Sequence, residues 1–238
     1  MLALVAAATT LGVALDERAI ERFARYRELL LAANALFNLT RVTEPLEIEM
    51  RLFADSLTLL PLIPSNATCL LDIGSGGGLP GLALAIARPD LSVDLLDATG
   101  KKVRFLADTA RELDLPHVRA IQGRAEDLAR DPAHREVYAV VTARAVARLV
   151  TLAELVLPFV APGGVALLPK GNAAAQELAD ARYAIGMLGG RARRPIRTPI
   201  EGTIIIAINK HKPTPAHFPR SPGIPNKTPL IAPRDFQP

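Results

Sequence analysis

The 238-residue sequence predicts an α/β fold with a mainly parallel sheet, helices on both faces of that sheet, an antiparallel C-terminal hairpin and a helical N-terminal cap. From residue 69 to residue 188, strand-like and helix-like segments alternate, which is typical of a parallel sheet covered by helices. The residues before this region have helical periodicity instead. Residues 202–209 are an apolar run that follows an extended segment after a short connection, so they predict an antiparallel edge strand.

The composition is that of a globular chain with a substantial core, because half of the residues are apolar and 22% are charged. We expect one structural domain in three segments. These are a helical cap at 1–64, an α/β core at 65–212, and a basic, proline-rich tail at 213–238.

In the cap, Asp16 is placed to begin a helix. Apolar side chains then recur at helical spacing on one face: Ile20, Phe23, Tyr26, Leu30, Ala33 and Phe37. A basic stripe lies beside that face, formed by Arg18, Arg22 and Arg25. A second helix is predicted from Glu47 to Leu60, ended by Pro61 and Pro64.

In the core, the alternation predicts five strands before the hairpin, at 69–73, 92–97, 118–122, 138–142 and 164–169. Helices are predicted near 80–88, 101–113, 150–158 and 173–188.

The sequence also argues against several classes of protein. Met1 to Leu15 is apolar but too short to span a bilayer, and it lacks the basic start of a signal peptide, so we expect no membrane association. Cys69 is the only cysteine, which favours a reducing, cytoplasmic setting. No Cys or His residues have metal-ligand spacing, so we expect no structural metal.

The stretch Asp72-Ile73-Gly74-Ser75-Gly76-Gly77-Gly78-Leu79-Pro80-Gly81 lies between a predicted strand and a predicted helix. A glycine turn in that position lets the backbone approach a nucleotide-like ligand closely. About 20 residues further on, Asp97 ends the next strand, where its carboxylate can accept the hydroxyls of a ribose. Together these features predict a nucleoside-containing cofactor.

Two cofactors compete for this turn. Gly76, Gly78 and Gly81 fit the G-x-G-x-x-G pattern of dinucleotide-binding proteins. Asp72, however, would repel a pyrophosphate and suits the cationic S-adenosylmethionine. With Asp72 included, Gly74, Gly76 and Gly78 match the D-x-G-x-G-x-G turn of methyltransferases. The alternative for Asp72 is that it caps the following turn.

Residues after the later strands are the remaining candidates, because ligands bind at the carboxyl ends of such strands. Ala125 and Glu126 could present backbone N–H groups to an adenine edge, or Glu126 could simply favour a helix N-terminus. Arg144 follows the fourth strand, where an ion pair is its structural alternative. Lys170 follows the fifth strand, where it could approach a phosphate, although an exposed turn lysine is the commoner case.

Missing motifs narrow the chemistry. Residues 142–145, Thr-Ala-Arg-Ala, replace the Pro-Pro-aromatic motif that enzymes methylating exocyclic amines carry. Cys69 lies in the wrong element for the nucleophile that pyrimidine-carbon methylation needs. A ring nitrogen such as guanine N7 needs neither the Pro-Pro-aromatic motif nor a cysteine nucleophile. The absence of both is consistent with such a nucleophile but does not identify it.

Motifs along most of the chain extend this pattern: Asn38-Leu39-Thr40, Arg51, Asp55-Ser56-Leu57, Asp72 to Gly81, Asp97-Ala98-Thr99, Lys101-Lys102, Phe105-Leu106, Arg144-Ala145, Gly163-Gly164 and Lys170-Gly171. The most specific ones are in the tail: Thr214-Pro215, Phe218-Pro219-Arg220, Gly223, Pro225 and Pro229-Leu230. In these motifs the chain resembles the RsmG family, also called GidB, of small-subunit ribosomal RNA guanine-N7 methyltransferases. It departs from the family at Leu52, where histidine is usual, and at Ala33, where tryptophan is usual.

The resemblance implies a Rossmann-like class I methyltransferase with a seven-stranded sheet. It also implies N7 methylation of a guanosine in the decoding-region loop of 16S ribosomal RNA, with S-adenosylmethionine as methyl donor. Together, the turn and the resemblance predict that the cofactor-binding residues are Asp72, Gly74, Gly76, Gly78, Leu79, Asp97, Ala98, Thr99, Ala125, Glu126 and Arg144. Arg144 is also the predicted catalytic residue, through orientation of the cofactor or the base.

The predicted partner is 16S ribosomal RNA, free or in a small-subunit particle, and we expect a monomer with no obligatory protein partner. From Arg191 onward there are nine Lys or Arg, two acids and ten of the twenty prolines. Such a tail is either solvated or a strap docked on the domain. We expect RNA phosphates to contact the tail, the basic stripe and Lys101-Lys102.

Two other functions are weighed against this one. An NAD-dependent oxidoreductase would need a hydride-transfer partner, and the tyrosines and histidines have no such spacing. A non-catalytic RNA-binding module would not need an intact glycine turn with Asp97.

Overall fold

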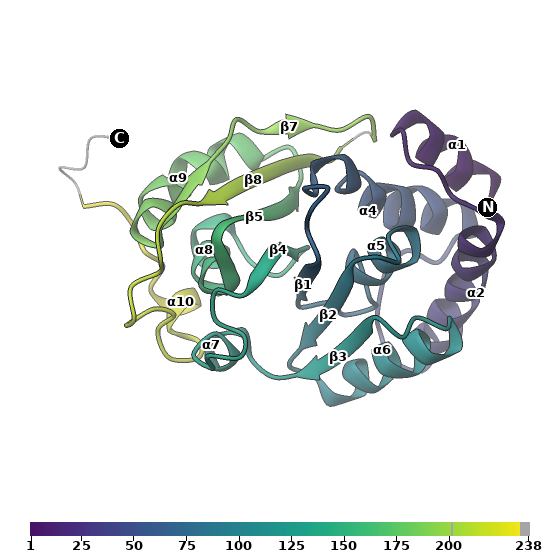
Figure 1. Ribbon diagram of the computed structural model, residues 1–238, viewed down its shortest axis with the longest axis horizontal. Coiled ribbons are helices and arrows are strands. Elements are labelled where there is room, and N and C mark those ends of the chain that lie inside the picture. Colours follow the sequence, from purple (N-terminus) through teal and green to yellow (C-terminus); the bar gives the residue numbers. More distant parts are fainter. Residues whose placement is uncertain (201, 234–238) are drawn as a thin grey trace. The chain divides into compact units, whose positions relative to one another are not determined.

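A computed structural model describes residues 1–200 and 202–233 of the chain. Its contacts divide the chain into two compact units. Figure 1 labels the helices and strands of both. The first consists chiefly of Met1–Gln122, and the second of Gly123–Thr198 with the chain from Gly202 onward. The three sequence segments at 1–64, 65–212 and 213–238 stay a prediction.

The first unit begins with helices. They are α1 (Leu2–Thr10), α2 (Glu17–Asn34), α3 (Pro45–Glu47), the π-helix η1 (Ile48–Ala54), α4 (Asp55–Leu57) and the 3₁₀-helix η2 (Leu60–Leu62). Asp16 begins α2 as predicted, because its side chain accepts a hydrogen bond from Ala19 N at 2.7 Å. Phe23 and Tyr26 on the predicted apolar face are fully buried, and both rings lie 5.1 Å from that of Phe53.

The prediction of one α-helix from Glu47 to Leu60 was wrong in detail. The helical stretch begins at Pro45, and seven of its residues form η1. Five residues of η1 are buried, and Glu49 is one of them. Its carboxylate lies 2.9 Å from the N-terminal ammonium and 2.7 Å from Arg27. Apolar spacing alone does not distinguish a π-turn from an α-turn, so no pattern in the sequence predicted η1.

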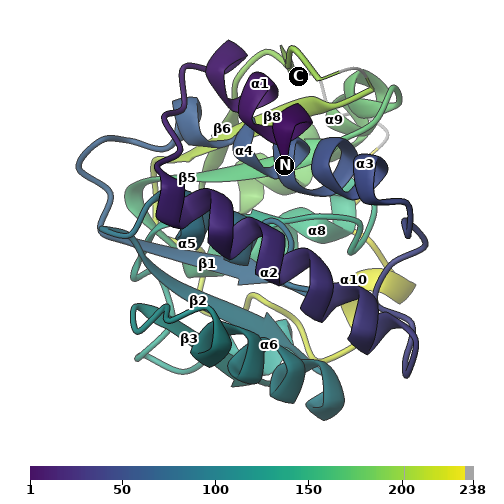
Figure 2. The same cartoon turned by 90° about the vertical axis from the view of Figure 1, so that its right-hand side faces the viewer.

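A parallel three-stranded arrangement completes the first unit. Its elements are β1 (Cys69–Ile73), α5 (Gly81–Ala87), β2 (Ser92–Asp97), α6 (Gly100–Glu112) and β3 (Val118–Gln122). β2 pairs in parallel with both β1 and β3, so the carboxyl ends of all three strands point the same way. α6 packs on β2 and β3, and α2 runs beside α6 (Figure 2).

The second unit contains α7 (Ala125–Leu128), β4 (Tyr138–Ala143), α8 (Leu149–Val156), the 3₁₀-helix η3 (Leu157–Phe159), β5 (Val160–Lys170), α9 (Ala174–Met187), β6 (Gly190–Ala192), β7 (Ile196–Arg197), β8 (Ile204–Lys210) and α10 (Ile224–Lys227). β4 and β5 are parallel, and β8 runs antiparallel to β5. β6 and β7 both pair with β8, which gives the predicted antiparallel C-terminal arrangement. β8 itself is not the predicted edge strand, because it pairs with β5 on one side and with β6 and β7 on the other. β6 and β7 are separate segments because Pro195 lies between them and has no N–H to donate to a β-ladder.

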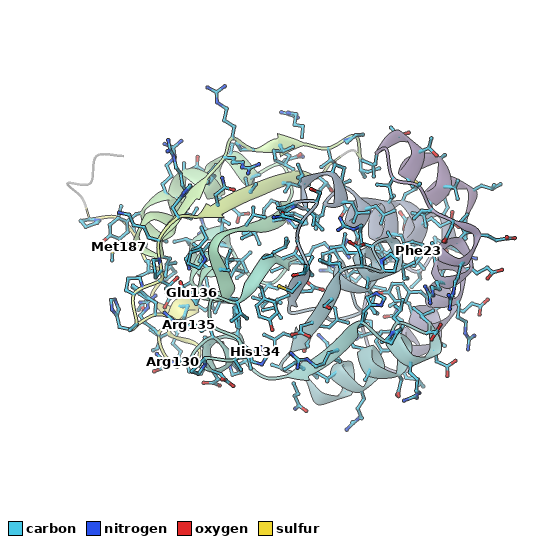
Figure 3. All side chains as sticks on the ribbon, viewed as in Figure 1. Phe23, Arg130, His134, Arg135, Glu136 and Met187 are labelled. Atoms are coloured by element: carbon cyan, nitrogen blue, oxygen red, sulfur yellow. The ribbon has the colours of Figure 1, made fainter. Side chains whose placement is uncertain are left out.

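The tail is a docked strap in the described residues. Residues 213–228, the C-terminal strap, lie on the second unit, where Thr214 is 4% and Phe218 3% exposed. Arg135 donates to the carbonyls of Thr214 and Phe218, both at 2.8 Å, and Arg130 donates to that of Pro219. Figure 3 shows Arg130 and Arg135 where the strap passes. Of the two interpretations of the tail, the strap is the one observed.

The strap also covers a buried lysine. Lys210 ends β8 with a fully buried side chain, whose ammonium donates to Leu157 O and Thr214 Oγ1 at 2.6 Å and lies 2.8 Å from a carboxylate oxygen of Glu136. Burial lowers the pKa of Lys210, and the Glu136 carboxylate opposes this shift. The Thr214 motif is therefore explained by the cation that it helps to satisfy.

Candidate cofactor site

The turn after β1 has the backbone geometry that its glycines predict. Gly74, Gly76 and Gly78 have φ values of 68°, 57° and 93°, a region that other residues rarely adopt. A Cβ on Gly78 would lie 2.4 Å from Leu82 Cδ1 and 2.7 Å from Tyr26 Oη. The Tyr26 hydroxyl itself donates to Gly77 O at 2.5 Å, so α2 supports the turn. Sequence reasoning placed Tyr26 on the buried face of its helix but missed this contact.

Replacing Gly78 by alanine should destabilise the first unit by about 2 kcal/mol or more, from the positive φ and the two close contacts. Thermal or denaturant unfolding would measure the loss. Gly171→Ala is the control, because no atom lies within 4 Å of an added Cβ there. Equal stability of the two variants would contradict the assigned strain.

Asp97, at the end of β2, ties two turns together. Its Oδ2 accepts from Gly76 N at 3.0 Å, and its Oδ1 accepts from Thr99 N at 2.8 Å. The residue is 7% exposed, and Lys102 Nζ lies 3.9 Å from Oδ2. A carboxylate offers about four lone-pair sites, so the two backbone bonds leave capacity for further donors such as ribose hydroxyls.

Asp72 is fully buried, and its Oδ2 accepts from Gly81 N at 3.0 Å. This bond ties Asp72 to the last residue of the glycine stretch, which is also the first residue of α5. It fits the capping role that the sequence left open for Asp72. A Cβ on Gly81 would approach Asp72 Oδ2 to 2.8 Å, so glycine is required for the close approach. A contact between Asp72 and a cationic cofactor stays a prediction. Leu79 is buried in the same turn, and Ala98 is exposed after β2.

In the second unit, Ala125 and Glu126 begin α7 and are 9% and 6% exposed. Glu126 Oε1 accepts from Gly223 N in the C-terminal strap at 2.9 Å, and Arg124 Nε lies 3.7 Å from Oε2. The strap therefore fixes a predicted adenine-binding residue. Gly223 was predicted as part of a tail motif, but its contact with Glu126 was not predicted, because nothing local in the sequence links the two residues.

Arg144 is half-buried directly after β4, and Ala145 next to it has a φ of 57°. A left-handed non-glycine residue is a form of backbone strain that clusters at functional sites. Lys170 holds this loop, because its ammonium donates to Ala147 O at 2.8 Å and to Glu177 Oε2 at 3.0 Å. Lys170 is neither an exposed turn lysine nor placed for a phosphate, since its side chain is 11% exposed and paired.

Several of the cationic groups predicted to contact RNA, those of the α2 stripe and Lys101, have intramolecular partners. Arg18 pairs with Asp114 at 2.5 Å, and Arg22 donates to the carbonyls of Leu113 and Asp114 at the end of α6. Lys101 lies over the ring of Phe37, 5.4 Å from its centroid. These contacts orient the α2 stripe toward a helix C-terminus, where cations are favourable. RNA contact by these groups stays a prediction.

Within the described residues, no group of three His, Cys, Asp or Glu side chains is arranged to hold a metal ion. None of the helices described is long and apolar enough to cross a membrane. The features that fit a ligand are the glycine turn with Asp97 in the first unit, and Glu126 and Arg144 in the second.

Comparison with known proteins gives the family. The family model for GidB, rRNA small subunit methyltransferase G, matches residues 19–194. A Roseiflexus castenholzii protein named ribosomal RNA small subunit methyltransferase G is 47% identical over 227 residues, covering 94% of this chain and 97% of that protein. The chain belongs to the GidB family. A Leuconostoc citreum protein of the same name is 42% identical over 234 residues, covering 96% of this chain and 98% of that protein.

Solved structures agree on the fold. A Corynebacterium glutamicum protein aligns with a TM-score of 0.54 and 20% identity over 81% of this chain and 90% of its own. A variant of the 16S rRNA (adenine(1408)-N(1))-methyltransferase from Catenulisporales acidiphilia aligns with a TM-score of 0.52 and 15% identity, over 62% and 87% of the two chains. The predicted Rossmann-like class I methyltransferase fold is confirmed. The family assignment does not favour the oxidoreductase or a non-catalytic module.

Proposed function

We propose that this protein transfers a methyl group from S-adenosylmethionine to N7 of a guanosine in the decoding-region loop of 16S ribosomal RNA. The observation that carries the proposal is the nearly full-length similarity to proteins named ribosomal RNA small subunit methyltransferase G. The turn of Gly74, Gly76 and Gly78, tied to Asp97, supports it with the geometry that a nucleoside cofactor needs.

The cofactor supplies an electrophilic methyl group on a sulfonium, and the chain supplies the groups that hold it. We propose that the turn residues Asp72, Gly74, Gly76, Gly78 and Leu79 lie against its methionine part. Asp97, with Ala98 and Thr99, accepts its ribose hydroxyls. Ala125 and Glu126 bind its adenine edge.

The chain needs no general base for this substrate. Guanine N7 carries a lone pair and no proton, so the task of the protein is to align nucleophile and methyl group. We propose that Arg144 orients the base or the cofactor, from the strained loop that Lys170 and Glu177 hold in place. The rate should therefore show no essential side-chain ionisation between about pH 6 and 9.

Replacing Arg144 by alanine should lower methyl transfer by about 100-fold or more, as expected when a positioning contact at the reacting groups is lost. The measurement is 7-methylguanosine in 16S RNA by nucleoside analysis, with free RNA, precursor particles and mature subunits as substrates. Arg111→Ala is the matched control, because this arginine is exposed and pairs with Asp108 on its own helix. Product identified as N2-methylguanosine or 5-methylcytidine would overturn the proposed reaction.

A further inference from the structure

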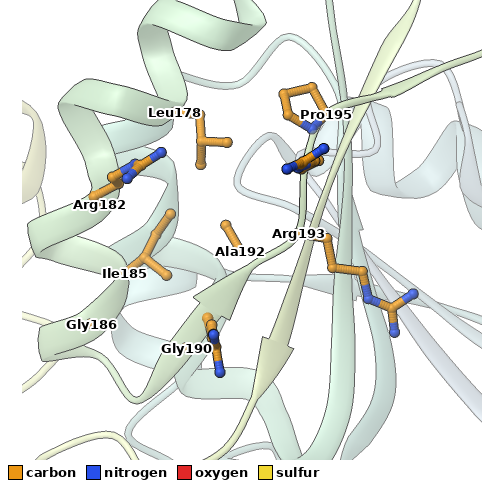
Figure 4. Close-up of a pocket in the computed structure, with 10 residues that line it drawn as sticks. Leu178, Arg182, Ile185, Gly186, Gly190, Ala192, Arg193 and Pro195 are labelled. Carbon is orange, nitrogen blue, oxygen red and sulfur yellow. The ribbon is translucent and has the colours of Figure 1, made fainter. Parts of the chain in front are cut away.

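A basic groove lies on the second unit, outside the proposed cofactor residues. It has a volume of about 350 Å³ and runs between α9 and the chain from Gly190 to Pro195. Figure 4 shows Leu178, Arg182 and Ile185 on α9, across from the segment that carries Ala192 and Pro195. Four arginines line the groove: Arg182, Arg191, Arg193 and Arg194. We name it the arginine groove.

The four arginines are exposed, and within the described residues no carboxylate lies within ion-pair distance of any of them. The two acids of α9 are engaged elsewhere, since Asp180 pairs with Arg148 and Glu177 with Lys170. Three exposed arginines of the first unit differ from these four, because Arg18, Arg25 and Arg111 each have an acidic partner. The groove is thus a local concentration of uncompensated positive charge.

Edge-strand charges have a second known role, which is to prevent pairing with another chain. β6 is such an edge, and Arg191 lies on it. This role does not account for Arg182, which comes from the middle of α9. Arginines from a helix and from an edge segment border one concave surface, and an anionic ligand explains this gathering better than edge protection does. Guanidinium groups are suited to phosphate because they form paired hydrogen bonds to its oxygens.

We propose that the arginine groove binds the phosphate backbone of the RNA substrate outside the methylated loop. This inference rests on the proposed function, which supplies RNA as the polyanion. Phosphate contacts fix the orientation of an RNA without reading its sequence. The groove therefore contributes affinity and salt dependence, and the residues of the cofactor site retain the choice of base.

The test is a variant with Arg182, Arg191, Arg193 and Arg194 all replaced by glutamine. Its control replaces four exposed, carboxylate-paired arginines by glutamine and so removes the same charge: Arg51, Arg111, Arg119 and Arg148. The dissociation constant for a 16S RNA fragment is measured between 50 and 300 mM salt, on the order of physiological values. We expect the groove variant to lose about 10-fold or more in affinity, and the slope of log affinity against log salt to become shallower by about 2–3.

The control variant should keep most of both quantities, and both variants should bind S-adenosylhomocysteine as the wild type does. Equal salt slopes in the two variants would overturn the proposal that the arginine groove binds RNA, and would mean that these four arginines are simply solvated. That failure is distinct from failure of the proposed function, in which the wild-type protein itself forms no 7-methylguanosine in 16S RNA.

Discussion

Replacing Arg220 by alanine should lower the free energy of unfolding by about 3–5 kcal/mol, the range for an uncompensated buried charge. Glu154 on α8 is 1% exposed and is neutralised by this arginine of the C-terminal strap. The guanidinium donates to both carboxylate oxygens, through Nε at 2.9 Å and Nη2 at 2.6 Å. Without it, the one remaining donor to this carboxylate among the described residues is Arg220 N, at 2.8 Å. Denaturant unfolding measures the loss.

The double variant Glu154→Ala/Arg220→Ala should be more stable than Arg220→Ala alone, because it removes the uncompensated charge together with its partner. Arg148→Ala is the exposed control. Its partner Asp180 lies at 3.1 Å, but the two side chains are 72% and 37% exposed, so the loss should be below about 1 kcal/mol. If Arg220→Ala is no more costly than Arg148→Ala, the strap is not held by this ion pair.

The Arg220→Ala variant should also have a lower affinity for the cofactor. The strap continues from Arg220 to Gly223, whose N–H donates to Glu126. Undocking the strap removes that bond from a residue proposed to bind the adenine. We therefore expect weaker binding of S-adenosylhomocysteine in this variant. An effect on RNA affinity alone would instead fit the solvated-tail interpretation that the structure does not show.

The elements that the sequence predicted well are those fixed by local pattern. The strand ending at Asp97 and the helix beginning after Asp16 follow from apolar alternation and from a capping side chain, and both were found at their predicted positions. The turn glycines were predicted for the same reason, because a positive φ is a local requirement.

What the sequence could not give is which distant groups meet. Lys170 was interpreted by its neighbours in the chain, but its partner Glu177 and the carbonyl of Ala147 are brought to it by folding. The basic stripe was interpreted by its charge, and its acidic partner Asp114 lies about a hundred residues away in sequence. The proline-rich strap has no helical period, and its order comes from Arg135 and Glu154 on other elements.

Replacing Asp97 by asparagine should weaken cofactor binding by about 1–3 kcal/mol, because it removes charge-assisted hydrogen bonds to the ribose. We expect the protein to stay folded. Asparagine has one acceptor oxygen, whereas Asp97 uses one oxygen for Gly76 N and the other for Thr99 N. The amide NH₂ would face one of these donors, so part of the loss comes from a loosened turn. Calorimetry with S-adenosylmethionine and S-adenosylhomocysteine measures binding, and NAD should give no heat.

Two comparisons separate ribose recognition from a purely structural tie. Asp90→Asn is the control for charge, because Asp90 is 62% exposed and pairs with Arg88. Tyr26→Phe loosens the same turn without touching a carboxylate or a proposed cofactor residue, because it removes the hydroxyl that donates to Gly77 O. Its ratio of lost cofactor affinity to lost stability therefore gives the indirect effect. If Asp97→Asn loses much more affinity per unit of stability than Tyr26→Phe, Asp97 accepts the ribose directly. The Asp97→Asn variant could instead have a lower melting temperature and unchanged affinity for S-adenosylhomocysteine. In that case Asp97 only links the two turns through Gly76 N and Thr99 N, and it is not a cofactor-binding residue.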